Sequence, residues 1–139
     1  MAATDPLRLR YPAAVRVVGL GEPARAVVER IRPAAAAGIE WVVVDGAAAE
    51  GAAALGEGAD ILVLTPGDGA GQAPVAPLIG AHASRQGALV AGVVIGADAG
   101  VAAGRSGCLE DLRDAVDVLL VVADDGAFLG YLQALGGAP

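Results

Sequence analysis

Two glycine-rich loops hold the residue types that bind phosphate groups and nucleotides. The first loop spans residues 19–24, reads GLGEPA and directly follows a hydrophobic block. It matches the relaxed dinucleotide-binding pattern GxGxxA, in which glycines let the backbone approach a pyrophosphate at the start of a helix. Asp45 follows Gly21 by 24 residues, where an acidic side chain would accept the ribose hydroxyl groups. Gly19, Gly21, Ala24 and Asp45 are therefore candidate contacts to NAD.

Two residues of this loop oppose phosphate binding. Pro23 has no backbone N–H to donate, and Glu22 brings a negative charge to the place that a phosphate would occupy. The alternative interpretation is a tight turn from a strand into a helix, with Pro23 in the first helical turn and no ligand. The loop alone leaves both interpretations open.

The second loop spans residues 65–72 and reads TPGDGAGQ. Gly67, Gly69 and Gly71 stand at alternate positions, so their N–H groups could form an anion-binding nest at a helix start, with Gln72 beside them. Asp68 opposes an anion unless a metal ion lies between them. On this loop alone, a flexible connector is the simpler interpretation.

The elements that must position these loops form a regular alternation. Continuous Val/Ile/Leu runs are typical of strands buried on both faces. We expect strands over residues 15–18, 39–44, 61–64, 88–95 and 118–122. Alanine-rich segments between them favour helices over residues 23–32, 47–55, 75–86, 106–115 and 125–135.

This order predicts one α/β domain of the Rossmann-like type. We expect a doubly wound, mainly parallel sheet of about five strands with helices on both faces. Residues 1–14 would form an N-terminal extension and residues 15–137 the domain. Ligands of such sheets bind beyond the carboxyl ends of the strands, where both glycine loops fall.

Composition excludes several classes of function. The net charge is −7, no lysine is present, and only four residues are aromatic, so nucleic-acid binding is disfavoured. One cysteine, Cys108, and one histidine, His82, exclude a cysteine-rich or multi-histidine metal centre within the chain. We expect Cys108 to be packed and His82 to face solvent, and we assign no catalytic or metal-binding residue. Without an apolar run that could span a membrane, a cytoplasmic location is expected.

Several segments together resemble the amino-terminal half of FtsZ, the bacterial tubulin-like GTPase of cell division. The likeness is carried by VRVVGLG at residues 15–21, GIEWVVVD at 38–45, GADILVLT at 58–65, GALVAGVV at 87–94 and VDVLLVVADD at 116–125. It spans roughly residues 15 to 130, and the register over several segments is more specific than any single motif. The resemblance implies the fold described above and a site for GTP or GDP.

The resemblance assigns nucleotide contacts to both glycine loops and to two further positions. The implied contacts are Gly19, Gly21, Asp45, Gly67, Gly69, Gly71, Gln72, Arg105 and Asp125. Arg105 stands where the family contacts the ribose, and Asp125 where it approaches the guanine base. The chain departs from the family at its phosphate loops: Glu22, Pro23 and Ala24 replace three residues of a family glycine run, and the signature GGGTGTG becomes GAGQAPV.

These departures imply a degenerate GTPase domain. The acidic loop that activates water in the family, and the family's second domain, have no counterpart in the sequence, so we expect no self-activated hydrolysis. We expect weak binding of GTP or GDP, or none, and a role in protein interaction, such as capping an FtsZ-type filament or self-association. A dinucleotide-binding module for NAD and a structural α/β domain without a ligand remain the alternatives.

Overall fold

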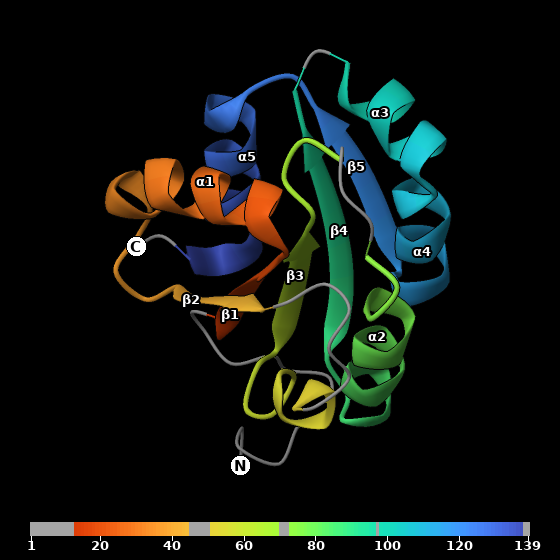
Figure 1. Cartoon of the computed structure of the whole chain (residues 1–139). Coiled ribbons are helices and arrows are strands. Elements are labelled where there is room, and N and C mark those ends of the chain that lie inside the picture. The colour runs from red at the N-terminus through yellow and green to blue at the C-terminus, as the bar shows by residue number, and fades with distance from the viewer. Residues whose placement is uncertain (1–12, 45–50, 70–72, 97, 138–139) are drawn as a thin grey trace, which may run out of the picture.

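A computed structural model of the chain describes residues 13–44, 51–69, 73–96 and 98–137. Five strands form a single parallel sheet in the order β2-β1-β3-β4-β5 (Figure 1). Their bounds are β1 (Val15–Leu20), β2 (Glu40–Val44), β3 (Ile61–Thr65), β4 (Leu89–Ile95) and β5 (Val118–Val122). The α/β class and all five expected strands are confirmed.

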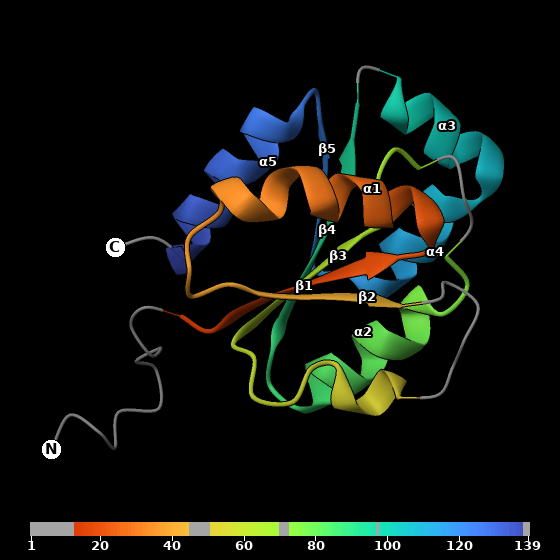
Figure 2. The same ribbon diagram turned by 60° about the vertical axis from the view of Figure 1, so that its left-hand side comes forward.

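Helices cover both faces of the sheet, as Figures 1 and 2 show. One face carries α1 (Glu22–Ile31) and α5 (Asp125–Leu132), and the other carries α2 (Ala76–Arg85), α3 (Ala99–Ser106) and α4 (Cys108–Ala115). Short helical turns η2 (Arg32–Ala34), η3 (Ala52–Ala54) and η4 (Gln133–Gly137) complete the described elements. Two apolar cores result, one on each side of the sheet.

Small residues set the spacing between helices and sheet. A Cβ atom added at Gly19 in β1 would lie 3.2 Å from the Ala24 Cβ and 3.3 Å from the Val28 Cγ2, both in α1. At Gly80 in α2, an added Cβ would clash with the carbonyl oxygen of Ala115 at the end of α4. Glycine is therefore needed where these elements approach each other closely.

Two of the expected helices differ in the structure. The helix expected over residues 106–115 is α4, and a further helix, α3, fills the segment before it; Gly107, with φ +81°, separates the two. The segment Ala99–Ser106, for which we expected no helix, is thus helical. Of the helix expected over 47–55, residues 51–55 are described, and they contain only the short helical turn η3. Residues 45–50 lie outside the described residues.

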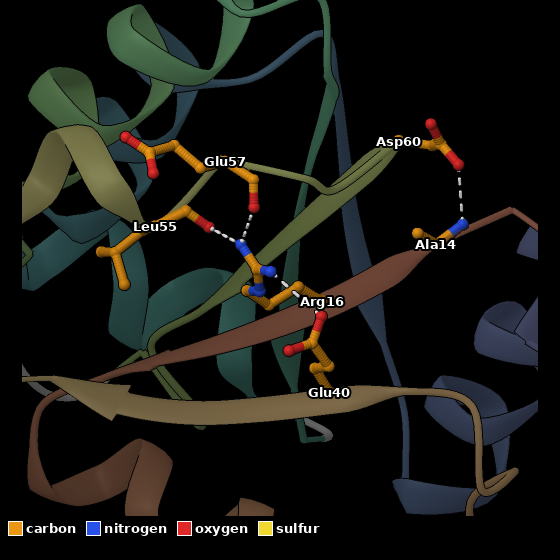
Figure 3. Close-up of polar contacts among 6 residues, drawn as sticks. All are labelled: Ala14, Arg16, Glu40, Leu55, Glu57 and Asp60. Carbon is orange, nitrogen blue, oxygen red and sulfur yellow. Dashed lines mark hydrogen bonds and ion pairs between the residues drawn. The ribbon is translucent and has the colours of Figure 1, made fainter.

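Arg16 ties three segments together at the amino-terminal end of the sheet (Figure 3). Its guanidinium donates from Nη1 to the carbonyl oxygens of Leu55 (2.6 Å) and Glu57 (2.7 Å), and from Nη2 to Glu40 Oε1 (3.0 Å). The Arg16 side chain is only 14% exposed, whereas that of Glu40 is 63% exposed. The carbonyl contacts therefore carry more of this side chain's contribution to stability than the ion pair does.

Ala14 is also fixed to the sheet, although the expected domain begins at residue 15. Its N–H donates to Asp60 Oδ2 (2.8 Å), and its carbonyl oxygen accepts from the N–H groups of Asp60 (2.8 Å) and Ile61 (3.1 Å). Figure 3 shows the Asp60 carboxylate beside Ala14. The described chain is thus anchored to β3 one residue before β1.

Candidate functional site

The candidate site lies at the carboxyl ends of the strands. The strand order reverses between β1 and β3, because β2 lies on one side of β1 and β3 on the other. In doubly wound sheets, ligands bind in the crevice at this reversal. The loop after β1 and the loop after β3 form its two walls, so both glycine-rich segments meet at the expected place.

The first loop begins inside the sheet. Gly19 is the fifth residue of β1, pairs with Val43 and Thr65, and is buried. Its lack of a side chain lets α1 pack on β1 through Ala24, which is completely buried. Gly19 and Ala24 therefore satisfy the packing part of the dinucleotide pattern, which any close strand-to-helix turn shares.

Gly21 makes the turn into α1. It has φ 87° and ψ −177°, and its N–H donates to the Val44 carbonyl oxygen (2.8 Å), so this donor is used within the fold. A cavity of about 340 Å³ lies here, lined by Gly21, Glu22, Arg25 and Val44. Arg25 Nε pairs with Glu22 Oε1 at 3.1 Å. Asp45 follows Val44 directly but lies outside the described residues.

Gly67 closes the crevice between the two loops. It has φ +75°, and a Cβ atom added there would lie only 2.6 Å from the Pro23 carbonyl oxygen and 3.0 Å from the Ala24 nitrogen. Its N–H donates to Thr65 Oγ1 (3.1 Å), and its carbonyl oxygen accepts from the Ile95 N–H (2.9 Å). The Gly67 backbone therefore lies directly on the first turn of α1.

Gly69 packs in the opposite direction, against α3. It is buried with φ +79°, and an added Cβ would lie 2.9 Å from the Ala103 Cβ. Its carbonyl oxygen accepts from Ser106 Oγ (2.8 Å). Gly71 and Gln72 lie outside the described residues, so the expected nest stays a prediction for that part of the loop.

A second, smaller depression lies beside this loop. It has a volume of about 170 Å³ and is lined by Asp68, Ile95, Gly96, Asp98, Ala99 and Ala102. Asp68 and Asp98 are exposed, and the remaining lining is apolar or backbone. The carboxylates make this depression unfavourable for an anion.

The last two expected nucleotide contacts lie apart from each other. Arg105 is exposed in the last turn of α3. Asp125 lies in the first turn of α5, where both of its oxygens accept from Arg30 of α1, at 2.9 and 3.0 Å. This hydrogen bonding lowers the pKa of Asp125 and raises that of Arg30; the charge of Asp68 also raises the pKa of Arg30. Asp125 thus has a cationic partner within the chain.

The sequence did not indicate that Arg25 and Arg30 lie near the candidate site at the carboxyl ends of the strands. Arg25 stands three residues after Glu22, a helical spacing that favours an ion pair and could have indicated the contact. The partner of Arg30 is 95 residues away, and no local pattern indicates it. Asp124 caps α5, its Oδ1 accepting from the Ala127 N–H at 2.8 Å.

The single cysteine and the single histidine, Cys108 and His82, lie in different surroundings. Cys108 is completely buried, as expected, and burial raises the pKa of its thiol to about 11. His82 is partly buried, and its Nδ1 lies 3.1 Å from an Arg85 nitrogen. Within the described ranges, no three His, Cys, Asp or Glu side chains lie close enough together to hold a metal ion.

No helix in the described part of the chain is both long and apolar enough to cross a membrane. Comparison with protein-family models gives no match, and no curated protein matches the chain. The likeness to FtsZ therefore stays a prediction from the residues quoted above.

Proposed function

We propose that this chain is a degenerate FtsZ/tubulin-like GTPase domain that acts by binding other proteins rather than by hydrolysing GTP. The observation that carries the proposal is the closed crevice between β1 and β3. Gly67 lies against the carbonyl group of Pro23, at the point where doubly wound domains hold a phosphate group. A triphosphate would have to separate the loop after β3 from α1.

The charges around the closed crevice also oppose a nucleotide. Glu22 and Asp68 are exposed on either side of it, and Pro23 has no N–H to offer. The N–H groups of Gly21 and Gly67 are already bonded to Val44 and Thr65. An entering phosphate would meet carboxylates and a carbonyl oxygen in place of donors, so binding of GTP or GDP is expected to be weak.

Calorimetric titration with GTP and GDP in the presence of magnesium tests this part of the proposal. The closed crevice predicts no saturable heat at micromolar nucleotide. Saturable binding with a micromolar Kd would mean that the loops separate readily. It would refute the proposal that the domain binds proteins instead of a nucleotide.

The partner that the resemblance supports is a subunit of an FtsZ-type filament. FtsZ subunits stack through the face that holds the nucleotide, so this domain would add to one filament end through that face and stop growth. Excess of this protein should therefore lower the mass of FtsZ polymer that sediments with GTP. Arg25→Glu, at the carboxyl edge, should weaken the inhibition, whereas the matched control Arg113→Glu on α4 should not. Unchanged polymer mass at molar excess would refute the partner.

A dinucleotide site is the second candidate, favoured by the cavity between the ends of β1 and β2. Its volume of about 340 Å³ falls within the range of small-molecule sites, and Gly21 and Val44 line it. Asp45, which follows Val44, is the residue that would bind the ribose. Saturable NAD binding that is lost in Asp45→Ala and kept in Asp98→Ala would establish this candidate. Absence of NAD binding would remove it.

A further inference from the structure

Strand β5 forms one edge of the sheet. It pairs in parallel with β4, and no other strand among the described residues pairs with it. Its side chains are correspondingly open to solvent: Val118 is 41% exposed and Val121 is 50% exposed. Figure 1 shows β5 as the last strand of the sheet beyond β4. The edge therefore presents both apolar side chains and backbone groups.

The outward backbone groups of β5 belong to alternate residues. The Gly96 N–H donates to the Val122 carbonyl oxygen (2.9 Å), so the backbone groups of Val122 face β4. Because N–H and C=O directions alternate along a strand, those of Leu119 and Val121 face away from the sheet. A further strand could bond to these groups without disturbing the pairing with β4.

The β5 edge lacks the usual protection against such pairing. Natural edge strands are blocked by lysine, proline, inward-pointing charges or bulges. The five residues of β5 read VLLVV and contain none of these. The opposite edge strand, β2, instead begins with Glu40, which is paired with Arg16. The two edges of the sheet therefore differ, and only β5 is apolar throughout.

Carboxylates stand at both ends of this edge. Asp117 precedes β5 and accepts from the Val90 N–H (2.9 Å), and Asp124 lies two residues after β5, where it caps α5. The chain as a whole carries a net charge of −7. The electrostatics thus favour a partner with positive charge at both ends of an apolar stretch. A second copy would bring the same carboxylates and the same net charge.

We propose that β5 binds an extended segment of a partner protein, with about five apolar residues between arginine or lysine residues, as a sixth strand of the sheet. Backbone bonds from Leu119 and Val121 hold the segment, and Asp117 and Asp124 attract its basic ends. On one face, Val121 lies against α3, at 3.8 Å from a Cβ built on Gly100, and Val101 of α3 is 60% exposed. This helix extends the apolar surface. The interaction does not depend on the FtsZ resemblance or on any nucleotide.

The test uses the full chain and a labelled peptide, Arg-Val-Ile-Val-Ile-Val-Arg, with binding followed by fluorescence anisotropy. Val121→Pro removes an outward N–H without removing a bond to β4, a position where edge strands tolerate proline. It should weaken binding about tenfold, because one backbone bond is lost and a carbonyl group of the peptide is left without a donor. Val121→Ala, which keeps the N–H, is the matched control and should weaken binding less.

Three further measurements keep the proposal falsifiable if the proline variant unfolds, which circular dichroism would reveal. Val121→Lys places a positive charge on the edge and should also weaken binding of the basic peptide. Asp124→Asn, which retains the helix cap, should weaken binding and reduce its dependence on salt. The same peptide with glutamate at both ends should bind more weakly than the arginine peptide.

Three outcomes would overturn the proposal. The first is equal peptide binding by the wild-type chain and a folded Val121→Pro or Val121→Lys variant. The second is equal or tighter binding of the glutamate-ended peptide. The third is a dimer of the chain, detected by sedimentation equilibrium, that Val121→Lys dissociates, because β5 would then be occupied by a second copy.

Discussion

Gly67→Ala is the substitution that probes the closed crevice most directly. Gly67 has a positive φ of 75°, and a Cβ atom there would lie 2.6 Å from the Pro23 carbonyl oxygen. Both properties oppose alanine. Gly87, at the end of α2, separates the two effects because it has φ +87° but no atom within 4 Å of an added Cβ. Gly87→Ala therefore reports the backbone effect alone.

The expected magnitudes follow from these geometries. An L-residue in the left-handed region costs about 1–2 kcal/mol, and this cost applies to both substitutions. Forcing a methyl group into a packed contact adds about 1–3 kcal/mol, and this applies only to Gly67→Ala. Gly67→Ala should therefore lower the free energy of unfolding by about 2–5 kcal/mol, and Gly87→Ala by about 1–2 kcal/mol.

Urea unfolding of the two variants and the wild-type chain, followed by circular dichroism, measures the difference. A lower midpoint with an unchanged m-value would assign the loss to the folded state. Equal destabilisation of Gly67→Ala and Gly87→Ala would refute the reasoning, because it would mean that Gly67 does not press on Pro23. The proposed closure of the crevice would then lose its main support.

Four other predictions concern single side chains. Arg16→Met should lower the free energy of unfolding by about 2–3 kcal/mol in urea, because two backbone carbonyl groups lose a charged donor, whereas Glu40→Gln should change it by less than about 1 kcal/mol. Cys108 should resist a thiol reagent in the folded chain at pH 8 and react with it in urea. Burial raises the pKa of its thiol from 9.0 to about 11, so the contribution of Cys108 to the free energy of unfolding should fall as the pH rises between these values. Asp124→Ala should lower the melting temperature through loss of about 1 kcal/mol of capping, and Asp124→Asn should restore most of it. The ion pair lowers the pKa of Asp125, so its stabilisation is present above the ordinary pKa and lost as the pH falls through the lowered value; Asp125→Asn should make melting less sensitive to acid, and unchanged sensitivity would contradict this.

The strands could be predicted because their signal is local. Continuous β-branched runs identify buried parallel strands, and all five predicted runs are strands of one sheet. Helix α3 escaped prediction because Gly100 and Gly104 give its segment a low helix propensity. Packing of Ala99 and Ala103, one turn apart and both buried, stabilises this helix against that propensity.

The arrangement of the candidate site depends on contacts that no local pattern contains. The sequence indicated that both glycine loops lie at the carboxyl edge, and the described parts of both lie there. It did not indicate that Gly67 contacts Pro23, because that contact depends on where α1 lies on the sheet and on the register of β1 with β3. The contacts of Arg16 with Leu55 and Glu57 could not be predicted for the same reason, because these residues lie 39 and 41 positions further along the chain.

The contact between Gly67 and Pro23 has a consequence for how this edge can evolve. Replacing Pro23 with glycine would supply an N–H donor and replacing Glu22 would remove a negative charge, but the Gly67 backbone would still lie where an anion must enter. Moving the loop after β3 alone would open the crevice onto a proline and a carboxylate. Neither change by itself gains an anion site, so the two are epistatic. Mutations at the exposed surface, in contrast, can accumulate one at a time, which makes a new binding partner easier to acquire than a phosphate site.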